Sequence, residues 1–204
     1  VDDNPRPDKI NGEAIYFEDA QIGEVFAGRG DSVGGHFATK RSDVSNIIFG
    51  DSGDNSDLHG STQADRVYGM AGDDTLKGYS GDDYLEGGKG DDHLHGGASD
   101  KYGDILKGGK GNDTYYYNAG DGNDTIIDSD GVGSIEWNNQ TLTAVSLNES
   151  NSHIDDEKGI RYVFEPDVVG GTVGTLKLFD IANPTESSIT VENYTLGQLG
   201  VTNS

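Results

Sequence analysis

Three nine-residue units, GMAGDDTLK (69–77), GYSGDDYLE (78–86) and GGKGDDHLH (87–95), follow one another without a gap. A degenerate unit, GSTQADRVY (60–68), precedes them. A unit lengthened by three residues (96–107) and the regular GGKGNDTYY (108–116) come after them. Each unit starts with glycine, and each regular unit has Asp at its sixth position. Repetition at a short fixed period predicts a solenoid, in which every unit packs only against its neighbours.

The last three residues of each unit predict a short β-strand, because they alternate polar, apolar, polar and turn only the middle side chain toward a core. These apolar residues recur at intervals of 18, or of 21 across the insertion. One series is Leu58, Leu76, Leu94 and Tyr115, and the other is Val67, Leu85 and Leu106. Two units per turn place the two series on opposite walls. The spacing therefore predicts a parallel β-roll.

The acidic residues of the units form a column of their own. Carboxylates 18 residues apart, such as those of Asp74 and Asp92, would stack on adjacent turns, where like charges repel unless a cation lies between them. Oxygen ligands in flexible loops suit Ca²⁺, which takes about six to eight of them, better than Mg²⁺. Softer metals are disfavoured because this column offers no thiolate or imidazole.

The candidate calcium site combines the acidic column with the glycine-rich turns. Glycines at positions one, two and four permit unusual backbone conformations and leave carbonyl oxygens uncovered. The carboxylates are those of Asp65, Asp74, Asp83, Asp92, Asp104, Asp113 and Asp124. The turn residues are Gly69, Met70, Ala71, Gly72, Gly78, Tyr79, Ser80, Gly81, Gly87, Gly88, Lys89, Gly90, Gly96, Gly97, Ala98, Gly108, Gly109, Lys110 and Gly111. Gly and Asp also mark ordinary polar turns, but a phased array with matched apolar columns favours calcium.

The units fit the pattern G-G-x-G-x-D-x-U-x, in which U is a large apolar residue, and thereby resemble the RTX (repeats-in-toxin, haemolysin-type) calcium-binding repeat family. The resemblance is specific over 60–128, looser over 129–204 and weak over 1–42. It implies an all-β fold: a calcium-binding parallel β-roll with a β-rich C-terminal cap, from a large secreted bacterial toxin or adhesin. It also implies export by type I secretion machinery, which reads an uncleaved C-terminal signal.

The composition limits the partners. The formal net charge is −23, from 37 acidic and 14 basic residues, which argues against nucleic acid and anionic membrane surfaces. About a fifth of the chain is Leu, Ile, Val or Phe, so the repeats are expected to be an expanded coil without metal. The chain has no cysteine and no 18-residue apolar run, which predicts no disulfide and no membrane span. It has no N-terminal signal peptide or initiator Met, which predicts a segment of a longer protein.

The flanks suggest three regions. Residues 1–42 are expected to be a linker and strand-rich lead-in, with strand-like pieces at 14–17 and 24–27; residues 43–128 form the roll, and residues 129–204 the cap. Asn46-Ile47-Ile48-Phe49 fits a unit with Asn at its sixth position. The next unit, 50–59, is one residue too long, so that Ser56 or Asp57 falls where a ligand is expected, and metal occupancy over 43–59 stays open. Alternation at 160–164, 175–179 and 188–191 predicts antiparallel strands in the cap.

Histidine and aromatic side chains are further candidates for function. His59, Lys77 and His95 share the ninth position and, with His93, suggest an outward column that solvation explains better than a transition metal does. Tyr115, Tyr116, Tyr117 and Trp137 suggest packing at the end of the roll rather than a sugar-stacking platform. No G-x-S-x-G motif and no Asp-Pro bond occurs, so no catalysis is expected.

The predicted function is that of a calcium-binding module, secreted to the extracellular space or the bacterial cell surface. It would fold on Ca²⁺ outside the cell and support secretion and stability of a larger protein. One alternative is an adhesin segment, or a module of a polysaccharide-modifying enzyme, with a cell-surface glycan or protein as ligand. Another is a folding tail of a lipase or protease. The sequence does not distinguish these parents, nor does it give the number of ions or the oligomeric state.

Overall fold

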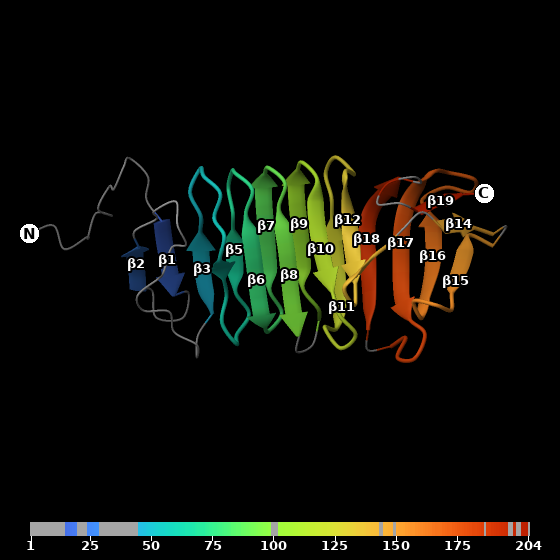
Figure 1. Cartoon of the computed structure of the whole chain (residues 1–204), viewed down its shortest axis with the longest axis horizontal. Coiled ribbons are helices and arrows are strands. Elements are labelled where there is room, and N and C mark those ends of the chain that lie inside the picture. The colour runs from blue at the N-terminus through green and yellow to red at the C-terminus, as the bar shows by residue number, and fades with distance from the viewer. Residues whose placement is uncertain are drawn as a thin grey trace, which may run out of the picture.

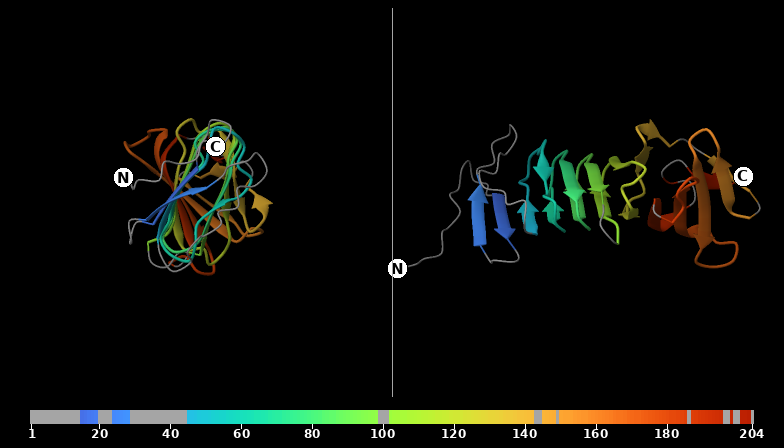
Figure 2. Two further views of the ribbon diagram at one scale, coloured as in Figure 1. Left: turned by 90° about the vertical axis from the view of Figure 1, so that its left-hand side faces the viewer. Right: turned by 90° about the horizontal axis from the view of Figure 1, so that it is seen from below.

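The computed structural model describes residues 15–19, 24–28, 45–98, 102–142, 145–148, 150–185, 187–195, 198 and 201–203. The described residues form an elongated stack of β-strands, with β1 and β2 toward one end and β14, β15 and β19 toward the other (Figure 1). Within the described ranges, no helix has the length and apolarity needed to cross a membrane. The view along the stack shows the chain winding around a common axis (Figure 2, left).

Two sheets face each other across the roll. Sheet I has eleven strands in the order β15-β16-β17-β18-β11-β9-β7-β5-β3-β1-β2, and sheet II has six in the order β13-β12-β10-β8-β6-β4. The sheet I strands of the roll are β3 (Asn46–Phe49), β5 (Arg66–Tyr68), β7 (Tyr84–Lys89), β9 (Ile105–Lys110) and β11 (Asn123–Ile127). Those of sheet II are β4 (Leu58–His59), β6 (Thr75–Ser80), β8 (His93–Ala98), β10 (Asp113–Tyr117), β12 (Gly133–Trp137) and β13 (Gln140–Thr141).

The pairing confirms the predicted register of two units per turn. In sheet II, Leu58 pairs with Leu76, Leu76 with Leu94, and Leu94 with Tyr115, all between parallel strands. In sheet I, Val67 pairs with Leu85, and Leu85 with Leu106. The structure extends the sheet II column at one end, by Ile135, and the sheet I column at both ends, by Ile48 and Ile126. Every one of these side chains is at most 2 % exposed.

One apolar residue per unit therefore suffices for a continuous core. Each side chain packs against the equivalent residue one turn above and below, and against the column on the opposite wall. A single unit could not bury its apolar residue alone, so the stability of the roll depends on stacking.

The C-terminal strands continue sheet I. They are β14 (Val145–Leu147), β15 (Ser152–Asp155), β16 (Ile160–Pro166), β17 (Val173–Asp180), β18 (Ser188–Thr195) and β19 (Val201–Asn203). Strands β15 to β18 are antiparallel, as predicted, and β14 pairs with β19 in a small separate sheet. Sequence reasoning missed that β18 pairs in parallel with β11, which places Val191 beside Ile126 at the end of the apolar column (Figure 1).

At the other end, β1 (Ile15–Asp19) and β2 (Glu24–Gly28) form an antiparallel hairpin. Strand β1 pairs antiparallel with β3, the first strand of the roll. Both strands lie where the sequence predicts strand-like pieces.

Candidate metal centre

The acidic column lies at the turns between the two sheets and is buried. Each of the seven predicted aspartates is at most 2 % exposed. A backbone N–H of one turn donates to the carboxylate of the turn above it. This bond joins Asp65 N to Asp83 Oδ1 (2.7 Å), Asp74 N to Asp92 Oδ1 (2.9 Å), Asp83 N to Asp104 Oδ1 (2.8 Å), Asp92 N to Asp113 Oδ1 (3.1 Å) and Asp104 N to Asp124 Oδ1 (2.9 Å). The bonds confirm the stacking predicted from the spacing.

The second oxygen of these carboxylates has a different environment. The Oδ2 atoms of six aspartates are buried and have no hydrogen-bond partner: those of Asp74, Asp83, Asp92, Asp104, Asp113 and Asp124. A buried acceptor without a partner costs roughly 1–3 kcal/mol, and more when it is charged. Six such atoms at equivalent positions therefore indicate that something besides protein satisfies them.

The first-position glycine of each unit faces this free oxygen. A Cβ atom on Gly69 would lie 2.5 Å from Asp74 Oδ2 and 2.7 Å from the carbonyl oxygen of Gly87 in the turn above. A Cβ on Gly78 would meet Asp83 Oδ2 and, at 2.5 Å, the carbonyl oxygen of Gly96. The side-chain carboxylate of one turn and a backbone carbonyl of the next thus converge beside the glycine.

These contacts and the backbone angles correct part of the prediction that glycines at positions one, two and four serve unusual backbone conformations. Positive φ angles occur at the second and fourth positions of the units, for example at Gly88 (118°) and Gly90 (123°), but not at the first. The first position needs glycine because of close approach rather than backbone conformation. At the second position Met70 (83°) and Tyr79 (81°) adopt positive φ despite their side chains, which costs roughly 1–2 kcal/mol for each.

Burial perturbs the carboxyl groups strongly. It raises the pKa of Asp74, Asp83 and Asp124 to about 8, that of Asp104 and Asp113 to about 7, and that of Asp92 to about 6. The negative charge of a stacked neighbour adds to the effect, as Asp104 does for Asp83. Without a cation, the folded roll therefore opposes ionisation of its own acidic column at neutral pH.

These pKa values give the metal-free roll a defined pH dependence. The carboxyls bind protons more tightly in the folded state than in the unfolded chain, so folding without calcium is most favourable below about pH 4 and is progressively lost as the pH rises toward about 8. We expect the chain in EDTA to gain β-structure by far-ultraviolet circular dichroism when the pH is lowered from about 8 to about 5. An unchanged spectrum across this range would contradict the assignment.

Ca²⁺ fits this donor set. Among the residues that the structure describes, no three His, Cys, Asp or Glu side chains converge to hold a metal by themselves. The sites must therefore add backbone carbonyls to the carboxylates, and such all-oxygen sets in turns suit Ca²⁺. A bound Ca²⁺ supplies the positive charge that the stacked carboxylates lack. The free Oδ2 atoms and the carbonyls of the first-position glycines are the groups that would hold it; ligation by the other turn residues stays a prediction.

Asp65 differs from the other members of its column. Its Oδ1 accepts hydrogen bonds from the backbone N–H of Asn46 (2.6 Å) and from Asn46 Nδ2 (2.7 Å). Its Oδ2 accepts bonds from Ser61 N and from Ser61 Oγ (2.8 Å). Both oxygens thus have protein partners, so Asp65 closes the column as a hydrogen-bond acceptor. Asn46 occupies the sixth position of the preceding turn, as the sequence predicts.

The next unit departs from the expectation. Neither Ser56 nor Asp57 faces the column: the N–H of Asn55 donates to Asp74 Oδ1 at 2.7 Å. Asp57 instead pairs with Lys77 Nζ on the outer face, at 3.3 Å. The extra residue of this unit shifts the ladder of hydrogen bonds to the carboxylates by one position. The spacing in the sequence does not show which residue takes the position in the ladder.

A second acidic ladder was missed by sequence reasoning. At the fifth position, the N–H of Asp91 donates to Asp73 Oδ1 (2.8 Å) and that of Asn112 to Asp91 Oδ1 (2.8 Å). These bonds run in the opposite direction to those of the sixth position, since the donor belongs to the upper turn. The doubled Asp-Asp in three successive units was the available signal. Because these carboxylates are exposed, we assign them to turn geometry.

The remaining candidates lie apart from the column. His59, Lys77 and His95 do form a column on sheet II. The ring of His95 stacks on Tyr116 at 3.9 Å, and His93 Nδ1 lies 2.9 Å from the Tyr116 hydroxyl, so these groups contact one another rather than surround a common point.

The aromatic residues at the end of the roll divide between core and surface. Tyr115, Tyr117 and Trp137 are buried, and the last two rings stack at 4.5 Å. Tyr116 faces outward.

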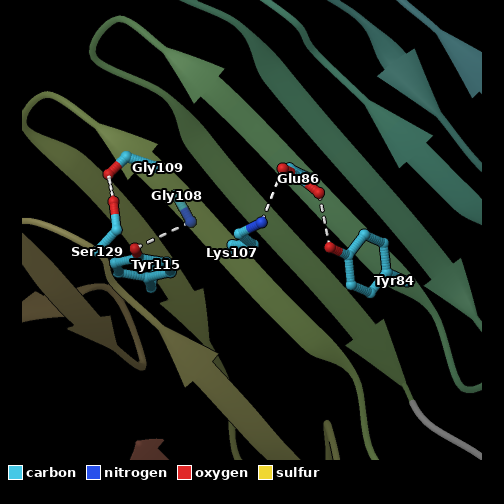
Figure 3. Close-up of polar contacts among 7 residues, drawn as sticks. All are labelled: Tyr84, Glu86, Lys107, Gly108, Gly109, Tyr115 and Ser129. Atoms are coloured by element: carbon cyan, nitrogen blue, oxygen red, sulfur yellow. Dashed lines mark hydrogen bonds and ion pairs between the residues drawn. The ribbon is translucent and has the colours of Figure 1, made fainter. Parts of the chain in front are cut away.

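A polar contact lies on the outer face of sheet I. Glu86 accepts hydrogen bonds from the Tyr84 hydroxyl and from Lys107 (Figure 3).

Comparison with known proteins points to the same residues. No curated protein matches the chain. The family profile described as the RTX calcium-binding nonapeptide repeat, in four copies, matches residues 59–94, 77–115 and 91–126. These overlapping matches span the turns that carry the acidic column. The nonapeptide match and the parallel roll together show that residues 59–126 are an RTX β-roll region, which binds Ca²⁺ at several of its repeats.

Proposed function

We propose that this chain is a module that folds on binding Ca²⁺ outside the cell and thereby supports secretion and stability of a larger secreted bacterial protein. The observation that carries the proposal is the set of six buried Oδ2 atoms without partners. They make the folded roll unfavourable where calcium is scarce and favourable where it is abundant. Metal binding and folding are then one event.

A net charge of −23 supports the same conclusion. An acidic chain with few large apolar residues remains extended without a counterion. An extended chain suits passage through type I secretion machinery, and calcium outside the cell would then drive folding. The module acts in this proposal by folding rather than by catalysis.

A calcium titration tests the proposal. We expect the full chain to be coil in EDTA at pH 7.5 and to gain β-structure with a midpoint of roughly 10⁻⁴–10⁻³ M Ca²⁺, the range of extracellular modules. Circular dichroism measures the transition, with Mg²⁺ at equal concentrations as the control. Full β-content in EDTA, or a midpoint at micromolar calcium, would contradict extracellular folding.

One observation supports binding as a second function. On the outer face of sheet I the ring of Phe49 stacks on Tyr68 at 5.0 Å, and Tyr68 lies 5.7 Å from Tyr84. A row of aromatic rings on a flat sheet suits the apolar face of a sugar or a protein side chain. A glycan-array screen with and without calcium separates this function, as an adhesin or a module of a polysaccharide-modifying enzyme, from folding alone.

A further inference from the structure

The turn above the last regular unit departs from the repeat at two positions. The first position holds Asp128, where the preceding units have glycine, and the sixth position holds Gly133, where they have Asp. The pairing of Asp113 with Gly133 establishes this alignment. The two changes lie beyond residue 126, where the match to the repeat profile ends.

Gly133 leaves Asp113 without the usual partner above it. In the lower turns, the N–H of the sixth-position Asp donates to the carboxylate of the next turn, as Asp92 N does to Asp113 Oδ1. Asp113 N donates instead to the carbonyl oxygen of Val132 at 3.3 Å. A Cβ atom on Gly133 would collide with the carbonyl oxygen of Asp113, so no carboxylate fits at this position.

Asp128 brings a carboxylate to the same turn from its other end. The turn lies over the one below it, because Ser129 Oγ donates to the carbonyl oxygen of Gly109 (Figure 3) and Gly111 N donates to Asp130 Oδ2 at 3.1 Å. Asp128 therefore occupies the position above Gly108.

The two oxygens of Asp128 have different roles. Its Oδ1 accepts the N–H groups of Asp130 (3.1 Å) and Gly131 (2.7 Å), which holds the turn together. Its Oδ2 is buried and has no hydrogen-bond partner, like the Oδ2 of the fully buried Asp113 below it.

Tyr115 brings a third oxygen to this place. It stands in the apolar column where lower turns have Leu94 and Leu76, and its hydroxyl accepts the N–H of Gly108 at 3.1 Å (Figure 3). A Cβ atom on Gly108 would meet both this hydroxyl and Asp113 Oδ2, so the two oxygens lie against the same glycine. Burial, the charges of Asp128 and Asp113, and a side-chain hydrogen bond to the Asp128 carboxylate raise the pKa of Tyr115, so its hydroxyl lies beside both carboxylates.

We propose that Asp113 and Asp128 hold one further Ca²⁺ that ends the stack, at a site the nonapeptide pattern does not encode. In the lower turns a carboxylate meets a carbonyl from the turn above, as Asp74 does with Gly87. Here the turn above offers a second carboxylate as well. Both Oδ2 atoms are shielded from water. The Tyr115 hydroxyl beside Asp128 carries no positive charge to balance the two like charges, whereas a divalent cation does. The inference rests on the proposed calcium-dependent folding, since it adds one ion to that array.

The substitution Asp128→Asn tests the site in the full chain. Asparagine retains the Oδ1 atom that holds the turn and replaces the free Oδ2 by an uncharged amide nitrogen, which does not bind Ca²⁺. We expect the number of Ca²⁺ ions bound at saturation to fall by one relative to the unsubstituted chain, measured by equilibrium dialysis. Asp156→Asn, an equal charge change at an exposed turn of the C-terminal strands, serves as the control and should bind the full number. Equal numbers for both variants would overturn the proposal.

A measurement on the unsubstituted chain covers the case in which Asp128→Asn does not fold. Crystals grown with Ca²⁺ and soaked in Tb³⁺ should show an anomalous peak between the carboxylates of Asp113 and Asp128. Peaks at the lower turns without one here would overturn the terminal site and leave calcium-dependent folding intact. No peak at any turn would instead count against the proposed function.

Discussion

A chain truncated after Asp130 is expected to lose calcium-induced folding, or to fold only at calcium concentrations at least tenfold higher, although every regular repeat survives. Truncation removes β18, so the backbone groups of β11 and the side chain of Ile126 lose their cover. It also removes Trp137, which stacks on Tyr117. The free end of a solenoid exposes unpaired backbone and apolar surface, and we propose that the C-terminal strands are the cap that prevents this.

A second truncation separates the two contributions. A chain ending at residue 142 keeps β12 and β13 on sheet II but still lacks β18 on sheet I. We expect its calcium midpoint to lie between those of the shorter fragment and the full chain, by circular dichroism at matched protein concentration. If the fragment 1–130 folds at the calcium concentration of the full chain, the C-terminal strands are an independent domain and the capping proposal is wrong.

Asp83→Asn is expected to change folding in opposite directions with and without calcium. In EDTA at pH 7 the variant should be more stable by about 4 kcal/mol, because it removes a buried charge whose pKa burial raises to about 8. Asn retains the Oδ1 that accepts the N–H of Asp65 and places an amide close to the carbonyl oxygen of Gly96. With calcium, the lost charged ligand should raise the midpoint by roughly tenfold or more.

The contrast with Asp65 tests the stacking register. Asp92→Asn should behave like Asp83→Asn, with a smaller gain in EDTA because the pKa of Asp92 is raised only to about 6. Asp65→Asn should shift the calcium midpoint least, since both Asp65 oxygens already have protein partners. The pH midpoint of folding in EDTA, which should rise for the stabilised variants, and the calcium midpoint of folding, both followed by circular dichroism, measure the two effects. Equal calcium shifts for all three variants would mean that position in the stack does not decide ion binding.

The sequence by itself determined the roll and its metal chemistry. The interval of 18 residues between Leu76 and Leu94 corresponds to one turn of two units, so these two residues align in one column and Leu85, nine residues from each, lies in the other. The same interval aligns the acidic residues, and buried like charges require a cation. These inferences succeed because a solenoid repeats one local interaction, so that the pattern within a few units already contains the long-range contacts.

Only the tertiary structure decided what happens where the repetition fails. The extra residue before Leu58 places Asn55 against Asp74 rather than Ser56 or Asp57. The parallel pairing of β18 with β11 joins segments separated by more than sixty residues, and no period in the sequence connects them. The position of the Asp128 Oδ2 atom is set by the turn that lies over Gly108, and no regular repeat follows that turn. Such contacts arise from packing at the ends of the stack, where each residue meets a partner that the repeating unit does not contain.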